Sequence, residues 1–209
     1  MVRFALVATL LFAFALPQTA PVDPAKLPAR DSHQGILVAC DPYQNPHRAR
    51  QAIGKENPLK AGVLPLEVYV RNSTRWPLAI SMDKIRLEVK LPGSDRQQIE
   101  PLGSGDLATM ILHPHPANVE VPRERLPLPL PRGNKEKKWR ALRDRLESLS
   151  FPAAVVAPGA TVHGFLYFDL GGRYDALRYA QLYVPELKFL GNSQSIMFFQ
   201  AALSGAGPD

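Results

Sequence analysis

The residues best suited to metal or acid–base chemistry in this 209-residue chain are its five histidines, and two of them are closely spaced. His113 and His115 alternate with prolines, and in an extended segment side chains two residues apart point the same way. The pair could supply half of a metal site. The proline after each histidine instead favours two solvated loop residues, so we predict no bound metal or cofactor.

Two aspartates, Asp41 and Asp169, each end an apolar run that is typical of a strand. A calcium-binding loop can lie at such a position, although aspartates at strand ends more often cap turns. The sequence contains no Gly-x-Ser-x-Gly, no glycine-rich phosphate loop and no Cys-x-x-Cys. We therefore predict a non-catalytic protein. A loop-based metal-binding protein or hydrolase, using His113, His115 and these aspartates, is the last of three functional hypotheses.

The net charge of +6 lies entirely in one segment. Residues 123–145 hold nine basic and three acidic side chains, and 9 − 3 = +6, so the rest of the chain is neutral. An apolar stripe with three- and four-residue steps predicts a helix at 135–149. The stripe consists of Trp139, Leu142, Leu146 and Leu149. The polar face carries Lys135, Lys138, Arg140, Arg143 and Arg145. This face could bind anionic lipid headgroups, or it could be the solvated side of a docked helix.

The N-terminus has the pattern of a secretory signal peptide. Arg3 precedes 13 apolar or near-apolar residues, 4–16, which is shorter than the roughly 20 residues of a transmembrane helix. We expect an exported protein, in the periplasm or associated with the cell envelope, with an uncleaved N-terminal membrane anchor as the alternative. The predicted division is a signal peptide at 1–20, a proline-rich linker at 21–34, a domain at 35–203 and a disordered tail at 204–209.

The single cysteine, Cys40, excludes an internal disulfide. Leu37-Val38-Ala39-Cys40 matches a lipoprotein box by its letters, but a polar, proline-rich stretch separates it from the apolar run. We expect Cys40 to be half-buried on the first strand of the domain, where it acts as a small apolar residue.

Alternating apolar residues predict strands through most of the domain. In the run 63–72, Leu66, Val68 and Val70 fall on one face, and the run 84–91 alternates as regularly. Further strands are expected at 35–39, 78–82, 155–162 with a turn at Pro158-Gly159, 164–169, 180–184, 188–190 and 195–201. A short helix is expected at 47–53, and 107–112 could be a helix or a strand. This pattern predicts an all-β sandwich of seven to nine strands.

Several motifs mark the turns of this sandwich. They are Asn72-Ser73-Thr74 with Pro77, Ile85-Arg86-Leu87, Val156-Ala157-Pro158-Gly159 and Gly164-Phe165-Leu166-Tyr167-Phe168. Together they resemble the immunoglobulin-like sandwich domains of secreted bacterial proteins and lipoproteins of unknown function. The resemblance covers roughly 60–91 and 153–203. It implies an immunoglobulin-like fold. The middle of the chain, at about 97–152, does not match the family, and we expect it to be an insertion of a loop and one α-helix, at about 135–149. The resemblance implies no activity.

The preferred functional hypothesis is a non-catalytic envelope or periplasmic domain for protein–protein interaction or assembly, because the edge strands of a sandwich can accept a partner strand. The second is binding to an anionic membrane surface through the basic helix. Nucleic acid is not expected as a partner, since an exported protein rarely meets it.

Overall fold

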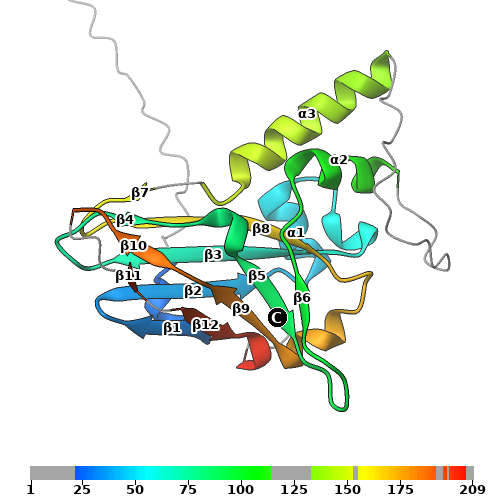
Figure 1. Ribbon diagram of the computed structural model, residues 1–209. Coiled ribbons are helices and arrows are strands. Elements are labelled where there is room, and N and C mark those ends of the chain that lie inside the picture. The colour runs from blue at the N-terminus through cyan, green and yellow to red at the C-terminus, as the bar shows by residue number, and fades with distance from the viewer. Residues whose placement is uncertain (1–21, 114–132, 153–154, 192–194, 197, 206–209) are drawn as a thin grey trace, which may run out of the picture.

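The computed structural model describes residues 22–113, 133–152, 155–191, 195–196 and 198–205. These residues form twelve strands in three four-stranded sheets, three α-helices and several short 3-10 turns. Every strand pairing is antiparallel. The protein is therefore mostly β and sandwich-like, as the alternating sequence pattern predicted (Figure 1).

The first sheet has the strand order β1-β2-β3-β8. Its strands are β1 (Ala29–His33), β2 (Ile36–Pro42), β3 (Val63–Asn72) and β8 (Thr161–Asp169). β3 lies between β2 and β8 and pairs with both along most of its length. Alternate residues of β3 face the same side, as the sequence pattern predicted. Leu64, Leu66, Val68 and Val70 all belong to the core between the two layers.

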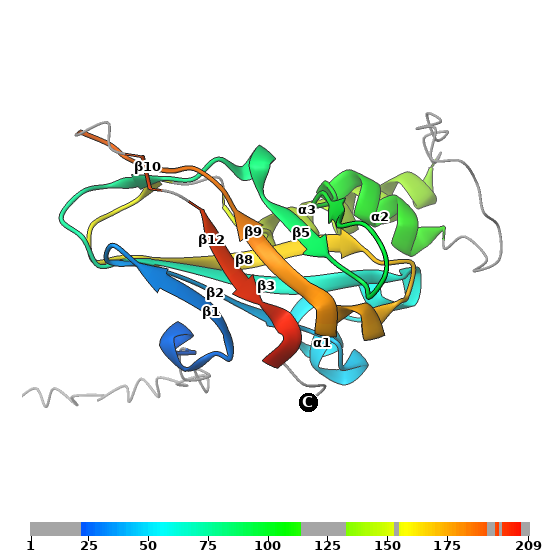
Figure 2. The ribbon, with the colours of Figure 1, turned by 60° about the horizontal axis from the view of Figure 1, so that its bottom comes forward.

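The second layer consists of two short sheets, with the orders β12-β9-β5-β6 and β11-β10-β4-β7. Their strands are β4 (Leu78–Ala79), β5 (Arg86–Val89), β6 (Gln97–Ile99), β7 (Val155–Val156), β9 (Ala180–Val184), β10 (Leu187–Phe189), β11 (Ser195–Ile196) and β12 (Phe199–Ala202). Figure 2 shows β5, β9 and β12 crossing the strands of the first sheet.

The number of strands exceeds the predicted seven to nine because β1 and β6 lie in segments where no strand was predicted, and because some apolar runs are interrupted. The run predicted as a strand at 78–82 ends at Ala79, and Met82–Lys84 forms a 3-10 turn before β5. The last predicted strand likewise divides into β11 and β12. Apolar side chains from both layers, such as Phe168 and Phe199, are fully buried between the sheets.

Three helices pack on the outer face of the first sheet, at the end of β3 and β8 where Val63 and Tyr167 lie. They are α1 (Pro46–Ile53), α2 (Ser104–Leu112) and α3 (Asn134–Leu149). Asn45 caps the start of α1, because its side chain accepts hydrogen bonds from two backbone N–H groups of the first turn. The insertion therefore holds two helices rather than the single helix predicted, and residues 107–112 are helical.

The structure also revises the predicted boundaries. β1 lies inside the linker predicted at 21–34, and β6 pairs with β5, so the first residues of the predicted insertion belong to a sheet. In the predicted tail, 204–205 continue a 3-10 turn that begins at Leu203. The predicted signal peptide at 1–20 and residues 206–209 lie outside the described residues.

The asparagine motif at the end of β3 forms the predicted turn. Asn72 is fully buried, and its side chain donates to the carbonyl oxygens of Trp76 at 2.7 Å and Val156 at 3.0 Å. Its Oδ1 accepts from the backbone of Thr74 at 3.0 Å. The side chain thus joins β3 to the strand pair β4–β7. Cys40 is fully buried rather than half-buried, and burial raises the pKa of its thiol.

The two layers meet on one side of the sandwich. The ring of His33 on β1 stacks on Phe199 of β12, with centroids 3.9 Å apart, and the backbone N–H of Gln200 donates to Asp31 at 2.9 Å. On the opposite side, β8 is an edge strand of the first sheet. The space between β8 and β5 holds the site described next.

Candidate functional site

Two segments of the chain form backbone hydrogen bonds with the outer edge of β8. The backbone N–H of Phe151 donates to the carbonyl oxygen of Phe165 at 2.9 Å, and that of Leu102 donates to Tyr167 at 2.7 Å. The first contact depends on Gly164, because a Cβ at this position would lie 2.5 Å from Cα of Phe151. The end of α3 and the start of α2 are therefore anchored to the same strand.

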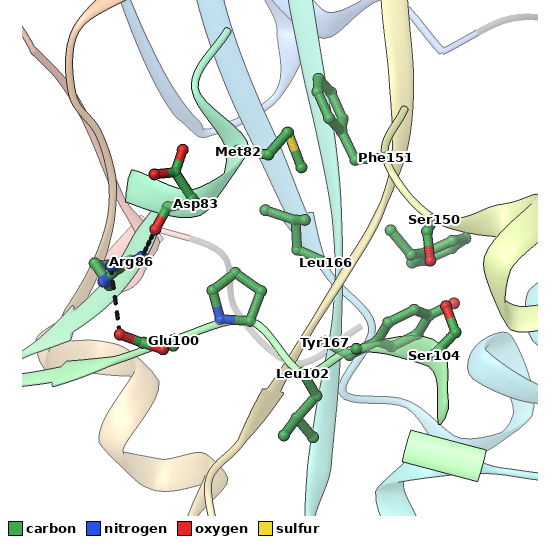
Figure 3. A pocket seen from close by; sticks show the side chains of 13 residues that line it. Met82, Asp83, Arg86, Glu100, Leu102, Ser104, Ser150, Phe151, Leu166 and Tyr167 are labelled. Atoms are coloured by element: carbon green, nitrogen blue, oxygen red, sulfur yellow. Dashed lines mark hydrogen bonds and ion pairs between the residues drawn. The ribbon is translucent and has the colours of Figure 1, made fainter. Parts of the chain in front are cut away.

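A cavity of about 430 Å³ lies between these anchored segments and β5 (Figure 3). It is lined by Met82, Asp83, Arg86, Glu100, Pro101, Leu102, Gly103, Ser104, Ser150, Phe151, Phe165, Leu166 and Tyr167. Met82, Phe151 and Leu166 supply apolar surface between two more polar walls. The volume is within the range of cavities that bind small organic groups.

One wall of the cavity carries charge. The Arg86 guanidinium donates to the backbone oxygens of Asp83 at 2.5 Å and Ile85 at 2.8 Å, and it lies 3.4 Å from a carboxylate oxygen of Glu100. The Asp83 carboxylate also lines this wall and is exposed. The two acids outnumber the single arginine, so this wall is slightly negative.

The opposite wall carries the hydroxyl groups of Ser104 and Ser150, and Tyr167 lies beside them with its own hydroxyl buried (Figure 3). The Ser150 hydroxyl donates to the carbonyl oxygen of Leu146 at 2.8 Å. Tyr167 is only 1% exposed, and its hydroxyl has no hydrogen-bond partner among the described residues. Burial also raises the pKa of Tyr167, so the hydroxyl stays a neutral donor. A buried hydroxyl without a partner is uncommon because it has lost its hydrogen bonds to water.

A second group of polar residues lies on the outer face of the first sheet, around the buried Glu67. The Glu67 carboxylate accepts from the Tyr43 hydroxyl at 2.7 Å and lies 3.0 Å from Nδ1 of His163. Burial and the Glu67 carboxylate together raise the pKa of Tyr43 and Tyr69. The partners of Glu67 come from the protein itself, so we interpret this cluster as structural.

The residues considered for a metal site are not brought together. Asp41 forms an ion pair with Arg48, and Asp169 caps a turn by accepting from the backbone N–H of Gly171 at 2.9 Å. The two aspartates lie on strands on opposite sides of β3. Asp41 of β2 lies opposite Glu67, whereas Asp169 of β8 lies opposite Val63. His113 is exposed at the end of α2, and His115 lies outside the described residues. No group of three or more potential metal ligands occurs in the part of the chain that the structure describes.

The basic helix α3 is docked through its apolar stripe. Leu142 and Leu146 are buried against α2 and the outer face of the first sheet, with Trp139 and Leu149 beside them. Trp139 also donates from Nε1 to the Thr109 hydroxyl of α2 at 3.0 Å.

Three of the five predicted surface-binding residues already have neighbours within the protein. Arg140 forms an ion pair with Glu136, and Arg143 pairs with Asp144 at 2.6 Å and lies over the ring of Trp139. The Arg145 guanidinium lies against Gly54 at the end of α1. Lys135 and Lys138 are exposed.

No protein-family model, curated protein or solved structure matches the chain. Within the described ranges, no helix is long and apolar enough to cross a membrane. The geometry of the site is therefore the main guide to function.

No motif in the sequence indicates the cavity. Its lining comes from four separate segments, at 82–86, 100–104, 150–151 and 165–167. Tyr167 appeared in the sequence only as one aromatic residue of a strand, and no local motif marks a hydroxyl that lacks a partner.

Proposed function

We propose that the protein is a non-catalytic domain of the cell envelope that binds a protein partner, and that the cavity beside β8 receives an extended segment of this partner. The observation that carries the proposal is the arrangement of the cavity, in which apolar surface lies between two polar walls. An immunoglobulin-like relationship of the sandwich and export through the N-terminal segment are parts of the same proposal.

A peptide segment suits this arrangement because each residue carries backbone polar groups on both sides of its side chain. A leucine- or phenylalanine-sized side chain could contact Met82, Phe151 and Leu166, while the flanking peptide groups face the charged and hydroxyl walls. A simple acyl chain has one polar end and would leave the other wall without a partner. The cavity therefore supports a peptide better than a lipid.

The structure favours side-chain insertion over the addition of a partner strand to this part of β8. The outward carbonyl oxygens of Phe165 and Tyr167 already accept from Phe151 and Leu102. A partner strand would have to displace both anchors. Binding to an anionic surface through α3 has less support, because the apolar stripe that could enter a membrane packs inside the protein.

Photo-crosslinking in cells tests this proposal. A benzoylphenylalanine residue is placed at Met82, which lines the cavity, and separately at Gln51, which is exposed on α1. We expect a discrete crosslinked protein from position 82 and none from position 51. Equal crosslinking at the two positions, or none at position 82, would contradict the proposal. Fractionation of the same cells checks the export.

A further inference from the structure

We infer that the partner segment carries a lysine or arginine two residues from the apolar side chain that enters the cavity, and that this cation lies against Asp83 and Glu100. The inference rests on the proposed function and adds which kind of peptide the cavity selects. Its basis is the uneven charge of the cavity, because both acids of the lining lie on one of the two walls beside the apolar surface.

Arg86 is the only basic side chain among the described residues that line the cavity, and the protein already engages it. Its guanidinium donates to the backbone oxygens of Asp83 and Ile85, and it also contacts one carboxylate oxygen of Glu100. The single positive charge of Arg86 therefore stays at the charged wall, where it offsets one of the two carboxylates.

Both carboxylates of this wall are accessible to a ligand. The Glu100 side chain is 65% exposed, and Asp83 is exposed as well. Arg86 contacts the backbone oxygen of Asp83 rather than its carboxylate, and the neighbouring Lys84 forms an ion pair with Glu186 at 2.8 Å. A cation brought by the ligand would thus meet two carboxylates that share one positive charge, and its interaction with the wall would be favourable.

The spacing between the two ligand side chains follows from the geometry of an extended chain. Side chains two residues apart point the same way and lie about 7 Å from each other. One of them can contact Met82 and Leu166, while the other reaches the adjacent wall of Asp83 and Glu100 (Figure 3). The long stem of lysine or arginine also lets the charge lie at the exposed carboxylates while its methylene groups cover apolar surface.

The charge of this wall is opposite to that of the whole chain. The chain carries a net charge of +6, so a long-range electrostatic attraction would favour an acidic peptide. The wall formed by Asp83, Arg86 and Glu100 has one more negative than positive group. A preference for a basic peptide therefore identifies local contact with the wall.

The test is an NMR titration of the isotope-labelled full chain with four five-residue probes, each blocked by an acetyl and an amide group. Three probes have the form X-Ala-Leu-Ala-X, in which X is lysine, glutamine or glutamate. The fourth, Lys-Ala-Ala-Ala-Lys, lacks the apolar side chain. We expect the lysine–leucine probe to shift the backbone signals of Asp83, Arg86 and Glu100. It should bind about fivefold more tightly than the glutamine probe, the effect of one partly exposed ion pair, and more tightly than the other two.

The decisive comparison combines Asp83→Asn and Glu100→Gln in one variant, with Asp95→Asn and Asp175→Asn combined as the matched control. The two control acids are exposed and lie outside the cavity, and both variants raise the net charge by two. In the first variant Arg86 leaves the wall positive, so we expect the glutamate probe to bind better than the lysine–leucine probe. The control should keep the original order. Unchanged binding of the glutamine probe by both variants verifies that the cavity is folded.

Equal binding of the three leucine probes, or tighter binding of the glutamate probe by the original protein, would overturn the inference while leaving the proposed function intact. The same holds if both variants change the order of the probes alike, or if Lys-Ala-Ala-Ala-Lys binds as tightly as the lysine–leucine probe. No binding of any probe would also overturn the inference, whereas the proposed function is judged separately by crosslinking at Met82.

Discussion

Replacing Tyr167 by phenylalanine should stabilise the protein, which is the opposite of what loss of a buried polar atom usually does. The Tyr167 hydroxyl is buried and has no hydrogen-bond partner among the described residues. A donor in this state costs about 1–3 kcal/mol relative to its hydrated form. Phenylalanine keeps the ring and its packing against α2 and α3 and removes that cost. The small void left by one oxygen offsets part of the gain, so we expect a net increase of about 1 kcal/mol in the free energy of unfolding.

Tyr174→Phe provides the comparison of opposite sign. The Tyr174 hydroxyl donates to the carbonyl oxygen of Leu59 at 2.8 Å, and Tyr174 packs against the core between the sheets. Removing this hydroxyl leaves the carbonyl without its partner, so we expect a loss of about 1 kcal/mol. The two variants, which make the same chemical change, should therefore differ by about 2 kcal/mol.

Urea denaturation measures both effects. The midpoint of Tyr167→Phe should lie above that of the original protein and that of Tyr174→Phe below it, with equal slopes for all three. If Tyr167→Phe loses as much stability as Tyr174→Phe, the Tyr167 hydroxyl has a partner such as a bound water in the free protein. That result would refute the interpretation of the Tyr167 hydroxyl as a buried donor without a partner.

Three further predictions concern other parts of the protein. Gly164→Ala should lower the free energy of unfolding by about 3 kcal/mol or more, because the added Cβ would clash with the backbone of Phe151. Gly105→Ala is the control for the same urea assay. Its Cβ would meet only the Trp139 ring at 3.6 Å, so this variant should be tolerated. Cys40 should resist thiol reagents at pH 8 until the protein unfolds. Its raised pKa keeps the thiol neutral in the folded protein, whereas the thiol of the unfolded chain ionises at high pH. The free energy of unfolding should therefore fall above about pH 9, and it should fall less steeply in Cys40→Ala. Replacing Lys135 and Lys138 together by glutamine should leave flotation of the full chain with anionic vesicles unchanged at low salt; a clear loss would restore the surface-binding hypothesis.

The elements with strong periodicity were predicted well from the sequence. β3 was predicted at its observed bounds, and α3 was predicted to within one residue at its start. Both have an apolar face that must be buried, so the period of the apolar residues identifies the element and its orientation. The motif at Asn72 was also predicted as a turn, because the asparagine side chain can replace backbone hydrogen bonds.

The elements that were missed have little apolar character of their own. β1 has the sequence Ala-Arg-Asp-Ser-His, and in β6 Gln97 and Gln98 are exposed. Each is a strand because a neighbouring strand, β2 or β5, offers it hydrogen bonds. A pattern within one segment cannot reveal a partner elsewhere in the chain.

The candidate site could not be predicted for a related reason. It depends on Phe151 and Leu102 meeting the same edge strand from different parts of the insertion. From the sequence, His113, His115 and the basic residues of α3 were the candidate site residues instead, because the chemistry of these residue types can be recognised without knowing the fold. Tyr167 differs from a core aromatic residue only in a hydrogen bond that is missing, and the residue type alone does not show this.

The junction between β1 and β12 has a consequence for the order in which the domain folds. His33 and Asp31 hold the first strand of the sandwich against Phe199 and Gln200 of β12, and the contact between Asp31 and Gln200 joins positions 169 residues apart. Contacts between such distant segments form slowly, because a long stretch of chain must be ordered before they are made. Until β12 reaches β1, the side of the core that Phe199 fills stays open, so closure of this side should be a late step in folding.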